Sequence, residues 1–395
     1  MAPSKRITGR IERSSVGGEQ VAAFIPKPLP PDDPPVVLDA ALAQRVRAAE
    51  QALTRLELAG EMVPSVDWFI YAFVRKEAVV SSQIEGTQAT LVDLLTFEAQ
   101  PETRAPPSAD VEEVCNYLDA LTLARKELAS PKGLPISMRL LNRVHRRLMR
   151  GVRGADRAPG EIRRTQNWIG GTRPGNAPYV PPPPHTLGEV LSAFEKYIHA
   201  DDALPPVVRA GLLHVQFETI HPYLDGNGRI GRLLVILLFE HWKLLTKPLL
   251  YLSLFLKRQR DEYYRRLTAV RTDGDWEGWI DFFLDGVTTI ADEAVTSARQ
   301  LFGLVATDRA RVLGHEGMSV AALRLFELLP RHPVVTVASV MKLVDASKPT
   351  AGKAIDLLAR VGVLHETTGK KRDRSFVYEK YLAQLRVGTE LARAR

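Results

Sequence analysis

The stretch HPYLDGNGRIGR, residues 221–232, is the most informative part of this 395-residue chain. The segments on both sides have helical hydrophobic patterns, so the stretch is expected to form a loop that leads directly into a helix. Gly226 and Gly228 let backbone N–H groups approach an anion closely, and the N-terminus of the following helix adds a positive dipole. Arg229 and Arg232 are three residues apart, so both project from the first turn toward the same anion. The pattern predicts a polyphosphate-binding site.

Two further residues of this stretch supply the chemistry of a transfer reaction. Asp225 offers a carboxylate oxygen, which is the kind of ligand that Mg²⁺ takes when it lies between phosphates. His221 has a side chain that accepts a proton near neutral pH. The stretch therefore combines a phosphate cradle, a metal ligand and a general base.

Other interpretations fit the stretch less well. Its glycines also match the G-x-G-x-x-G fingerprint of dinucleotide-binding folds, but that fingerprint follows a buried strand, whereas the residues before His221 have a helical pattern. The chain has no GxxxxGK[ST] sequence, which excludes a P-loop. The plain alternative is a glycine-rich turn with solvated arginines and a histidine buried by chance, and the joint spacing of all these residues argues against it.

Residues 221–232 resemble the signature of Fic-domain proteins, His-x-Phe-x-(Asp/Glu)-Gly-Asn-Gly-Arg-x-x-Arg. They match it at every position except Tyr223, which keeps the aromatic ring of Phe and adds a hydroxyl. The resemblance extends over residues 60 to 290, including a helix with Val144 and His145 on one face and the segment QNWIGG at 166–171. The chain is therefore similar to the Fic family well beyond one motif.

The resemblance implies a protein adenylyltransferase, which transfers AMP from ATP to a Ser, Thr or Tyr hydroxyl of a target protein, or of itself, and releases pyrophosphate. It implies that His221 takes the proton of the hydroxyl and that Asp225 holds Mg²⁺ between the α and β phosphates. The residues that it places around ATP are Gly226, Asn227, Gly228, Arg229, Ile230, Gly231, Arg232, Ile169, Gly170, Gly171, Thr172 and Tyr263. Of these, the two arginines bind the β and γ phosphates, and Tyr263 lies beside the adenine. Residues 169–172 belong to a β-hairpin flap that pairs with the target backbone by strand addition.

A second motif lies at SSQIEG, residues 81–86. Ser81 and Glu85 share a helix face, and Gly86 allows the chain to turn after the carboxylate. Without the first motif, the segment would be interpreted as a helix end with a solvated glutamate. Beside the first motif it resembles the (Ser/Thr)-x-x-x-Glu-(Gly/Asn) inhibitory motif of Fic proteins. The resemblance implies that Glu85 pairs with Arg232, so that ATP binds unproductively; in some relatives the same glutamate supports removal of AMP.

The fold expected from these patterns is mostly α, with a Fic-type helical core, a β-hairpin flap and a small C-terminal winged-helix domain of the α+β type. Prolines concentrated in KPLPPDDPP hold an extended conformation, so residues 1–36 are expected to form a leader or strap. We expect an N-terminal helical region with the inhibitory helix at 37–130, the catalytic core at 131–307 and the winged-helix domain at 314–395.

The last of these regions has its own charge and pattern. Residues 314–395 contain 14 basic and 8 acidic residues, and their pattern predicts helices at 321–329, 337–343 and 349–361. Residues 367–374 resemble a basic wing that leads into a strand at 375–378. Such a domain either contacts DNA, with a helix in the major groove and the wing on phosphates, or docks a protein or a second copy.

Two classes of function therefore remain open: an autoinhibited adenylyltransferase, or a DNA-binding regulator whose Fic-like region senses nucleotides. The presence of His221 favours the enzyme, because sensing requires no base. A narrower question is the transferred group, since relatives move UMP, phosphate or phosphocholine on the same scaffold.

Composition sets the remaining limits. The 53 basic and 46 acidic residues leave a net charge of +7, which is too mild to imply a polyanionic partner. Nine arginines between 139 and 164 are expected to be solvated or to attract ATP, and His214 and His241 to be structural. The single cysteine, Cys115, excludes an internal disulfide and favours the cytoplasm. Neither a membrane-spanning run nor a signal peptide is expected.

Overall fold

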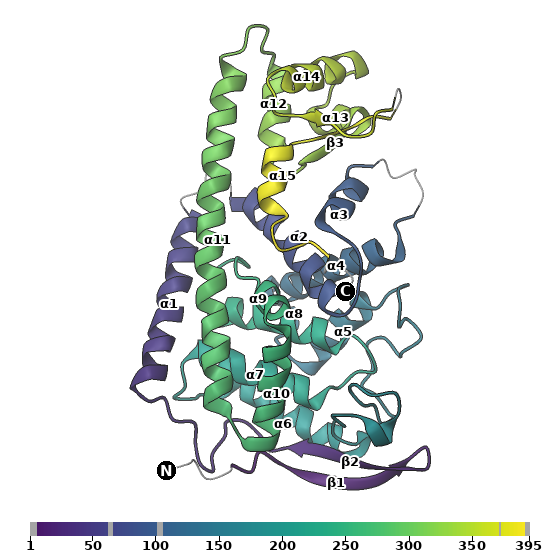
Figure 1. Cartoon of the computed structure of the whole chain (residues 1–395), viewed down its shortest axis with the longest axis vertical. Helices are drawn as coiled ribbons and strands as arrows, with labels where there is room; N and C mark the ends of the chain where they lie inside the picture. Colours follow the sequence, from purple (N-terminus) through teal and green to yellow (C-terminus); the bar gives the residue numbers. More distant parts are fainter. Residues whose placement is uncertain (1–5, 62–65, 101–105, 371–372, 392–395) are drawn as a thin grey trace. The chain divides into compact units, whose positions relative to one another are not determined.

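The computed structural model describes residues 6–61, 66–100, 106–370 and 373–391, and it is built mostly of helices (Figure 1). It divides into two units: unit 1 contains residues up to 54 and 116–291, and unit 2 contains residues 55–115 and 292–395. The chain passes from one unit to the other within α1 (Ala40–Glu61), α4 (Ala109–Ala129) and α11 (Trp276–Leu313). The mostly α fold predicted from the sequence is confirmed.

Unit 1 is centred on two buried helices that flank the motif. Besides the helices shared with unit 2, its elements are β1 (Gly9–Val16), β2 (Glu19–Pro26), α5 (Met138–Leu148), α6 (Leu187–His199), α7 (Pro206–Ile220), α8 (Asn227–His241), α9 (Ser253–Arg258) and α10 (Arg260–Asp273). Every residue of α7 from Val207 to Ile220 is buried, and so is every residue of α8 from Arg229 to Phe239. Because α7 and α8 pack against each other (Figure 1), the loop between them is anchored at both ends in the core.

The N-terminal segment differs from the leader expected from its prolines. Residues 9–26 form a regular antiparallel hairpin in which Gly9 pairs with Pro26 and Val16 with Glu19. The turn residues Gly17 and Gly18 both have positive φ, as a two-residue hairpin turn requires. Alternate residues of β2 face inward, and the N–H of Phe24 donates to the carbonyl oxygen of Val180 at 2.9 Å. The hairpin therefore packs on unit 1 as part of its structure.

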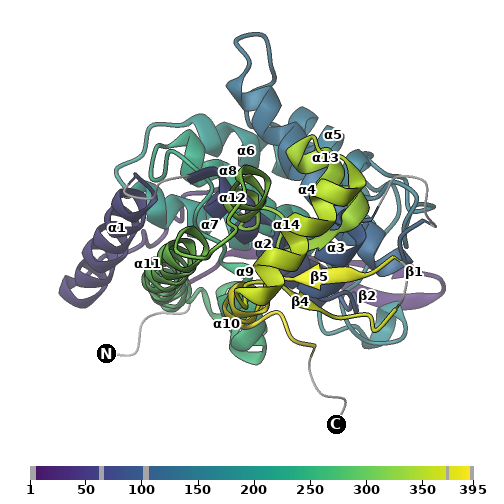
Figure 2. The ribbon, with the colours of Figure 1, turned by 90° about the horizontal axis from the view of Figure 1, so that it is seen from above.

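Unit 2 combines helices from both halves of the chain with a small sheet. Its elements are α2 (Val66–Ile84), α3 (Leu91–Glu98), α12 (Val320–Leu328), β3 (Val334–Thr336), α13 (Val337–Val344), α14 (Lys348–Arg360), β4 (His365–Glu366), β5 (Ser375–Val377) and α15 (Glu379–Leu385). The antiparallel sheet has the order β3-β5-β4, and Figure 2 shows β4 and β5 beside α14. The three helices and the strand predicted here are confirmed within two residues. Lys371 and Arg372 of the predicted wing lie outside the described residues.

Helix α2, which leads to the predicted inhibitory segment, is fastened to the C-terminal part of unit 2. At its start Arg331 forms an ion pair with Asp67 at 2.8 Å. At its end the amide of Gln83 donates to the carbonyl oxygens of Ala89 and Thr389, both at 2.9 Å. These contacts hold α2 at both ends.

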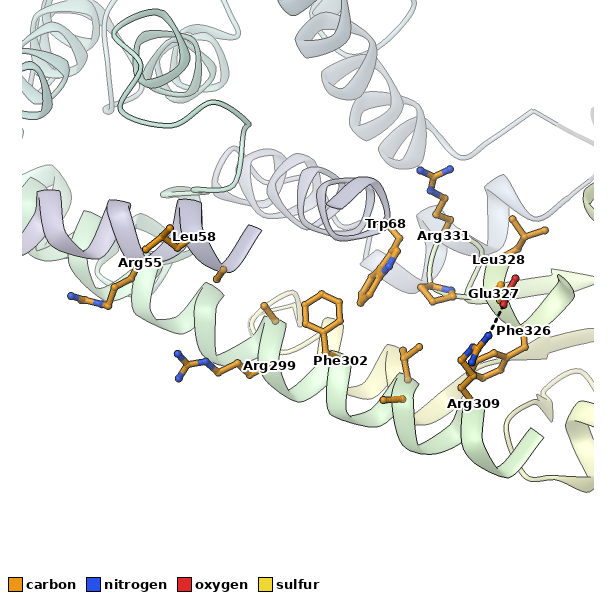
Figure 3. A pocket seen from close by; sticks show the side chains of 15 residues that line it. Arg55, Leu58, Trp68, Arg299, Phe302, Arg309, Phe326, Glu327, Leu328 and Arg331 are labelled. Carbon is orange, nitrogen blue, oxygen red and sulfur yellow. Dashed lines mark hydrogen bonds and ion pairs between the residues drawn. The ribbon is translucent and has the colours of Figure 1, made fainter. Parts of the chain in front are cut away.

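A groove of about 1150 Å³ also lies in unit 2 (Figure 3). The rings of Trp68 and Phe302 meet edge to face in it, with centroids 4.6 Å apart. An ion pair between Arg309 and Glu327 at 3.3 Å lies at one end. None of the site residues predicted from the sequence lines this groove.

Among the helices that the structure describes, none has the length and hydrophobicity needed to cross a membrane.

Candidate functional site

Two residues with left-handed backbone conformation shape the segment between α7 and α8. His221 caps α7 with φ 51° and ψ 61°, and its N–H donates to the carbonyl oxygen of Phe217 at 2.9 Å. Gly226 precedes α8 with φ 77°, and its carbonyl oxygen accepts the N–H of Ile230 at 3.1 Å. Positive φ is uncommon for residues other than glycine, and such residues concentrate at functional sites. The turn at His221 ends α7 and sends the chain into a short loop.

The N-terminus of α8 is the element of this loop whose geometry suits an anion. A helix begins with N–H groups that no carbonyl of the same helix can reach, and they carry the positive end of its dipole. A side chain at Gly226 would place its Cβ 2.9 Å from the sulfur of Met149 and 3.3 Å from Nε2 of His145. Glycine is therefore required here both by its positive φ and by the close approach of α5.

Asn227, the first residue of α8, uses its side chain to hold the loop. Its Oδ1 accepts the N–H of Tyr223 at 2.9 Å, and its Nδ2 donates to the carbonyl oxygen of the same residue at 2.8 Å. Asn167 donates to that carbonyl oxygen too, at 3.1 Å. Because the Asn227 side chain is buried and engaged with Tyr223, a phosphate would be bound by the backbone at this position and not by the amide.

Tyr223, the one departure from the Fic signature, is fully buried against His145. Their rings stack with centroids 3.9 Å apart and planes 5° apart, and the Tyr223 hydroxyl donates to Oδ1 of Asn142 at 2.8 Å. Nδ1 of His145 accepts the N–H of Gly160 at 2.8 Å, so Nε2 carries the proton and donates to the carbonyl oxygen of Asp225 at 2.9 Å. Burial lowers the pKa of His145 to about 4, which keeps the ring neutral at physiological pH. The extra hydroxyl of Tyr223 thus has a partner, and α5 holds the loop.

The charged residues of the motif differ in exposure. The guanidinium groups of Arg229 and Arg232 are almost completely buried. Arg229 donates to the sulfur of Met149 at 3.5 Å and forms an ion pair with Asp225 at 3.6 Å. The side chain of Asp225 is 40% exposed, and its Oδ1 accepts the N–H of Gly226 at 2.6 Å. The motif thus keeps its carboxylate near the surface while its guanidinium groups are held in the core.

Ile230 and Gly231 lie in the packing of α8 against its neighbours. Ile230 is fully buried, and a Cβ at Gly231 would lie 2.3 Å from Oε1 of Glu218 on α7. The carbonyl oxygen of Gly231 accepts a hydrogen bond from Nδ1 of His214 at 3.1 Å. Nε2 of His214 accepts the hydroxyl of Tyr263 at 2.9 Å, and burial lowers the pKa of His214 to about 4. Tyr263 is thus nearly buried, and its hydroxyl is part of a polar link between α7, α8 and α10.

The predicted flap is less regular than a hairpin. Ile169 and Tyr179 form an isolated antiparallel bridge, with hydrogen bonds of 2.9 and 3.4 Å, that closes residues 170–178 into a loop. Prolines on the return side provide no N–H, so the ladder cannot extend. Gly170 and Gly171 both have φ 70°, and both are exposed together with Thr172. The hydroxyl of Tyr179 donates to the carbonyl oxygen of Thr219 at 2.6 Å, which ties the flap to α7.

The predicted inhibitory residues lie at the end of α2. Ser81 is fully buried, while Glu85 is exposed one residue after the helix ends at Ile84. Gly86 has φ 98°, the left-handed turn predicted from its position. Glu85 belongs to unit 2 and Arg232 to unit 1, so their pairing remains a proposal.

Several residues that organise the loop were not predicted as functional. His145 was identified only as part of a helix face and Asn167 only as part of the segment 166–171, and Asn142 was not identified. Their partners are distant in sequence: Asn142 and Tyr223 are 81 residues apart. A buried histidine three positions from an asparagine on one helix face was the only local signal for them.

Two family models match the chain. The model described as "Fic/DOC family N-terminal" matches residues 43–126, and the model described as "Fic/DOC family" matches residues 135–239. The second range includes α5, the flap, α7 and most of α8. The predicted inhibitory segment lies in the first range.

Sequence and structure comparisons agree with these matches. The chain is 30% identical over 208 residues to a protein of Drosophila grimshawi named "Protein adenylyltransferase Fic", and the match covers 51% of this chain and 39% of that protein. The fold is similar to that of a Fic family protein from Desulfovibrio desulfuricans G20, with a TM-score of 0.55, 19% identity, and coverage of 87% of this chain and 97% of that one. For Fic-1 from C. elegans the TM-score is 0.51 at 19% identity, covering 67% and 74% of the two chains.

Proposed function

Because this chain belongs to the Fic/DOC family, we propose that it is a protein adenylyltransferase that transfers AMP from ATP to a Ser, Thr or Tyr hydroxyl of a target protein or of itself. The chain spans about two fifths of the length of the Drosophila relative that bears this name. The observation that carries the proposal is the left-handed His221 at the end of α7, followed directly by the glycine-led N-terminus of α8.

In the proposed reaction, His221 acts as the general base. Its imidazole takes the proton from the acceptor hydroxyl, and the oxygen forms a bond to the α phosphorus of ATP. The bond from that phosphorus to the oxygen bridging to the β phosphate breaks, and pyrophosphate leaves with the electron pair. Transfer at phosphorus depends mainly on alignment and charge stabilisation, and the fixed cap at the end of α7 supports such alignment.

The phosphates are proposed to bind at the N-terminus of α8. The backbone of Gly226, Asn227 and Gly228 provides the anion nest, and Arg229 and Arg232 hold the β and γ phosphates. Burial of these guanidinium groups supports the assignment, because an arginine in a dry site interacts more strongly with an anion than a solvated one does.

Asp225 is the proposed magnesium ligand. Among the described residues no group of three or more His, Cys, Asp or Glu side chains gathers as a metal site. Magnesium nevertheless needs only one or two carboxylates when phosphates and water complete its shell, and the half-exposed Asp225 beside the α8 N-terminus fits that requirement. When bound, the ion would neutralise charge on the α and β phosphates.

The flap residues 169–172, of which 170–172 are exposed, are proposed to line the nucleotide and to receive the target backbone. Nearly complete burial of Tyr263 supports a position at the inner wall of an adenine pocket and not one at its mouth.

Autoinhibition is proposed through Glu85, which would pair with Arg232 and displace the γ phosphate. If this pair is closed about 99% of the time, productive affinity falls roughly 100-fold. The left-handed turn at Gly86 and the anchoring of α2 by Gln83 support a defined position for this carboxylate.

Label transfer from ATP provides the test. With ATP labelled at the α phosphorus, Glu85→Gly is expected to label itself and target proteins strongly, while Glu85→Gly combined with His221→Ala should not. Equal labelling by wild type and Glu85→Gly would contradict the brake. Loss of label from a modified target upon incubation with wild type would assign AMP removal instead.

DNA binding is a second candidate function. It is supported by the order α12-β3-α13-α14-β4-β5 with sheet order β3-β5-β4, which is compatible with the proposed winged helix. Lys348 and Lys353 are exposed on α14, the helix that would enter the major groove. A shift of labelled DNA in a gel by the whole chain, weakening steeply as the salt concentration rises, would support DNA binding. The absence of a shift at low salt would contradict it and favour a module that docks a protein or forms a dimer. We also propose a cytoplasmic location, in agreement with the single cysteine.

A further inference from the structure

Arg163 is a buried arginine that the proposed chemistry does not use. Its residue surface is only 2% exposed, although it lies in the arginine-rich stretch expected to be solvated. Its backbone N–H donates to the carbonyl oxygen of Pro222 at 3.0 Å. The expectation of a solvated or ATP-attracting side chain is wrong for this residue, because the guanidinium faces inward.

The guanidinium of Arg163 donates to four carbonyl oxygens. Nε donates to His221 at 3.0 Å, and Nη2 donates to Ile220 at 3.4 Å. Nη1 donates to Thr165 at 3.3 Å, and Nη2 also donates to Pro182 at 2.5 Å. One planar group thus joins two pairs of carbonyl oxygens.

Each pair belongs to a different part of the proposed active site. Ile220 and His221 are the end of α7 and the left-handed residue that carries the proposed base. Thr165 and Pro182 are the two ends of the segment that contains the flap bridge between Ile169 and Tyr179. The side chain therefore connects the two ends of the flap segment with the backbone of His221, the proposed general base.

The positive charge of Arg163 is stabilised by backbone groups. Arg163 forms no ion pair with any residue that the structure describes, so backbone dipoles compensate its charge. The C-terminal carbonyls of α7 carry the negative end of the helix dipole, which favours a cation there. Burial lowers the pKa of Arg163 to about 10, so the group stays protonated at neutral pH.

We propose that Arg163 is a positioning residue that sets the direction of the His221 imidazole relative to the flap, so that the acceptor hydroxyl is brought to the base. This inference rests on the proposed adenylyl transfer. It assigns Arg163 an effect on the transfer step and on flap order. The effect on ATP affinity should be smaller, because the phosphates are proposed to bind mainly at the α8 N-terminus, which Asn227 and His145 hold separately.

The test uses the whole chain with Glu85→Gly as the active parent. Arg163→Lys keeps the charge but lacks the planar fork, so it cannot reach four carbonyl oxygens. Arg164→Lys is the matched control, since the side chain of the neighbouring Arg164 is 88% exposed and, within the described part of the chain, pairs only with Glu161 at 3.5 Å. The measurements are kcat for AMP transfer, the Kd of a non-hydrolysable ATP analogue, and amide exchange of peptides 166–180 and 217–226.

We expect kcat of Arg163→Lys to fall about tenfold or more, because charged hydrogen bonds that align the base are lost. The Kd for the analogue should stay within about threefold of the parent, and exchange should rise in both peptides together. Arg164→Lys should match the parent in all three. Millimolar guanidinium ion should partly restore transfer by Arg163→Ala but not by His221→Ala.

Three results would overturn the inference: unchanged kcat in Arg163→Lys, a rise in Kd as large as the loss in kcat, or faster exchange in only one peptide. If Arg163→Ala fails to fold, Arg163→Lys still decides. If the Glu85→Gly parent itself transfers nothing, the proposed function fails, and the exchange measurement still decides whether Arg163 couples the flap to the end of α7.

Discussion

Asn227→Ala tests whether this residue serves the loop mainly through its side chain. The substitution removes the acceptor of the Tyr223 N–H and one of the two donors to the Tyr223 carbonyl oxygen. Asn167 still donates to that oxygen, so the N–H is the group left without a partner. Leaving a buried donor unsatisfied costs about 1–3 kcal/mol. The loop should therefore open roughly 5- to 150-fold more often.

Amide hydrogen exchange measured by mass spectrometry is the appropriate assay, because it reports local opening in a chain of two units. The peptide that contains Tyr223 should exchange faster by that factor in Asn227→Ala, while peptides from α13 and α14 should not change. Asn167→Ala is the matched control: it removes only the second donor to the carbonyl oxygen, and we expect less than about a fivefold change. Equal effects of the two substitutions, or exchange within about twofold of wild type in a folded Asn227→Ala protein, would refute this account.

Three further predictions concern the same loop. Tyr223→Phe restores the Fic signature and removes only the hydroxyl that donates to Asn142. It should lower the free energy of opening the loop, measured by amide exchange, by about 0.5–1.5 kcal/mol and leave transfer by the Glu85→Gly protein within about threefold. A large loss of activity would show that the hydroxyl acts in the reaction. Gly226→Ala should destabilise the loop by about 1–2 kcal/mol, because φ 77° disfavours a Cβ, and should weaken binding of an ATP analogue measured by calorimetry; unchanged affinity would contradict the role of the α8 N-terminus. His145 and His214 both have pKa values lowered to about 4 in the folded chain, whereas the ordinary histidine pKa in the unfolded chain is about 6.5. Between these values the unfolded chain binds protons that the folded chain does not. The free energy of unfolding should therefore be highest above pH 6.5 and fall as the pH drops from 6.5 to 4. Melting temperatures across this range should fall less in His214→Gln than in wild type, and parallel curves would contradict that assignment.

The sequence was informative wherever the signal was local. Serine is a typical N-cap residue, and the side chain of Ser137 accepts the N–H of Leu140 at the start of α5, at 3.3 Å. The helices α12, α13 and α14 were predicted from their apolar periodicity. Ser347 precedes α14, and Pro349 lies in its first turn, where proline is well tolerated. Capping and periodicity depend on neighbours a few residues away, so a single sequence reveals them.

What the sequence did not reveal depends on tertiary contact. The alternation of Val21, Ala23 and Ile25 indicates a strand, but the prolines that follow at 26–35 dominated the prediction of a leader. The role of Arg163 depends on carbonyl oxygens brought together from residues up to 58 positions away. Asn227 was predicted to line the phosphate site, and the sequence did not reveal that its side chain holds Tyr223. In these cases the sequence shows the type of residue, but it does not show which distant residue the side chain contacts.

The position of the label in ATP tests the central claim most directly. Glu85→Gly protein is incubated with a cell lysate and with ATP labelled at either the α or the γ phosphorus, with Glu85→Gly/His221→Ala as the control. Label that depends on His221 should come from the α position only, because the α phosphorus bonds to the acceptor and the γ phosphorus leaves in pyrophosphate. The γ-label that kinases of the lysate transfer should be the same with both proteins. γ-Label that is lost together with His221, or α-label that is equal in the two proteins, would contradict the proposed transfer.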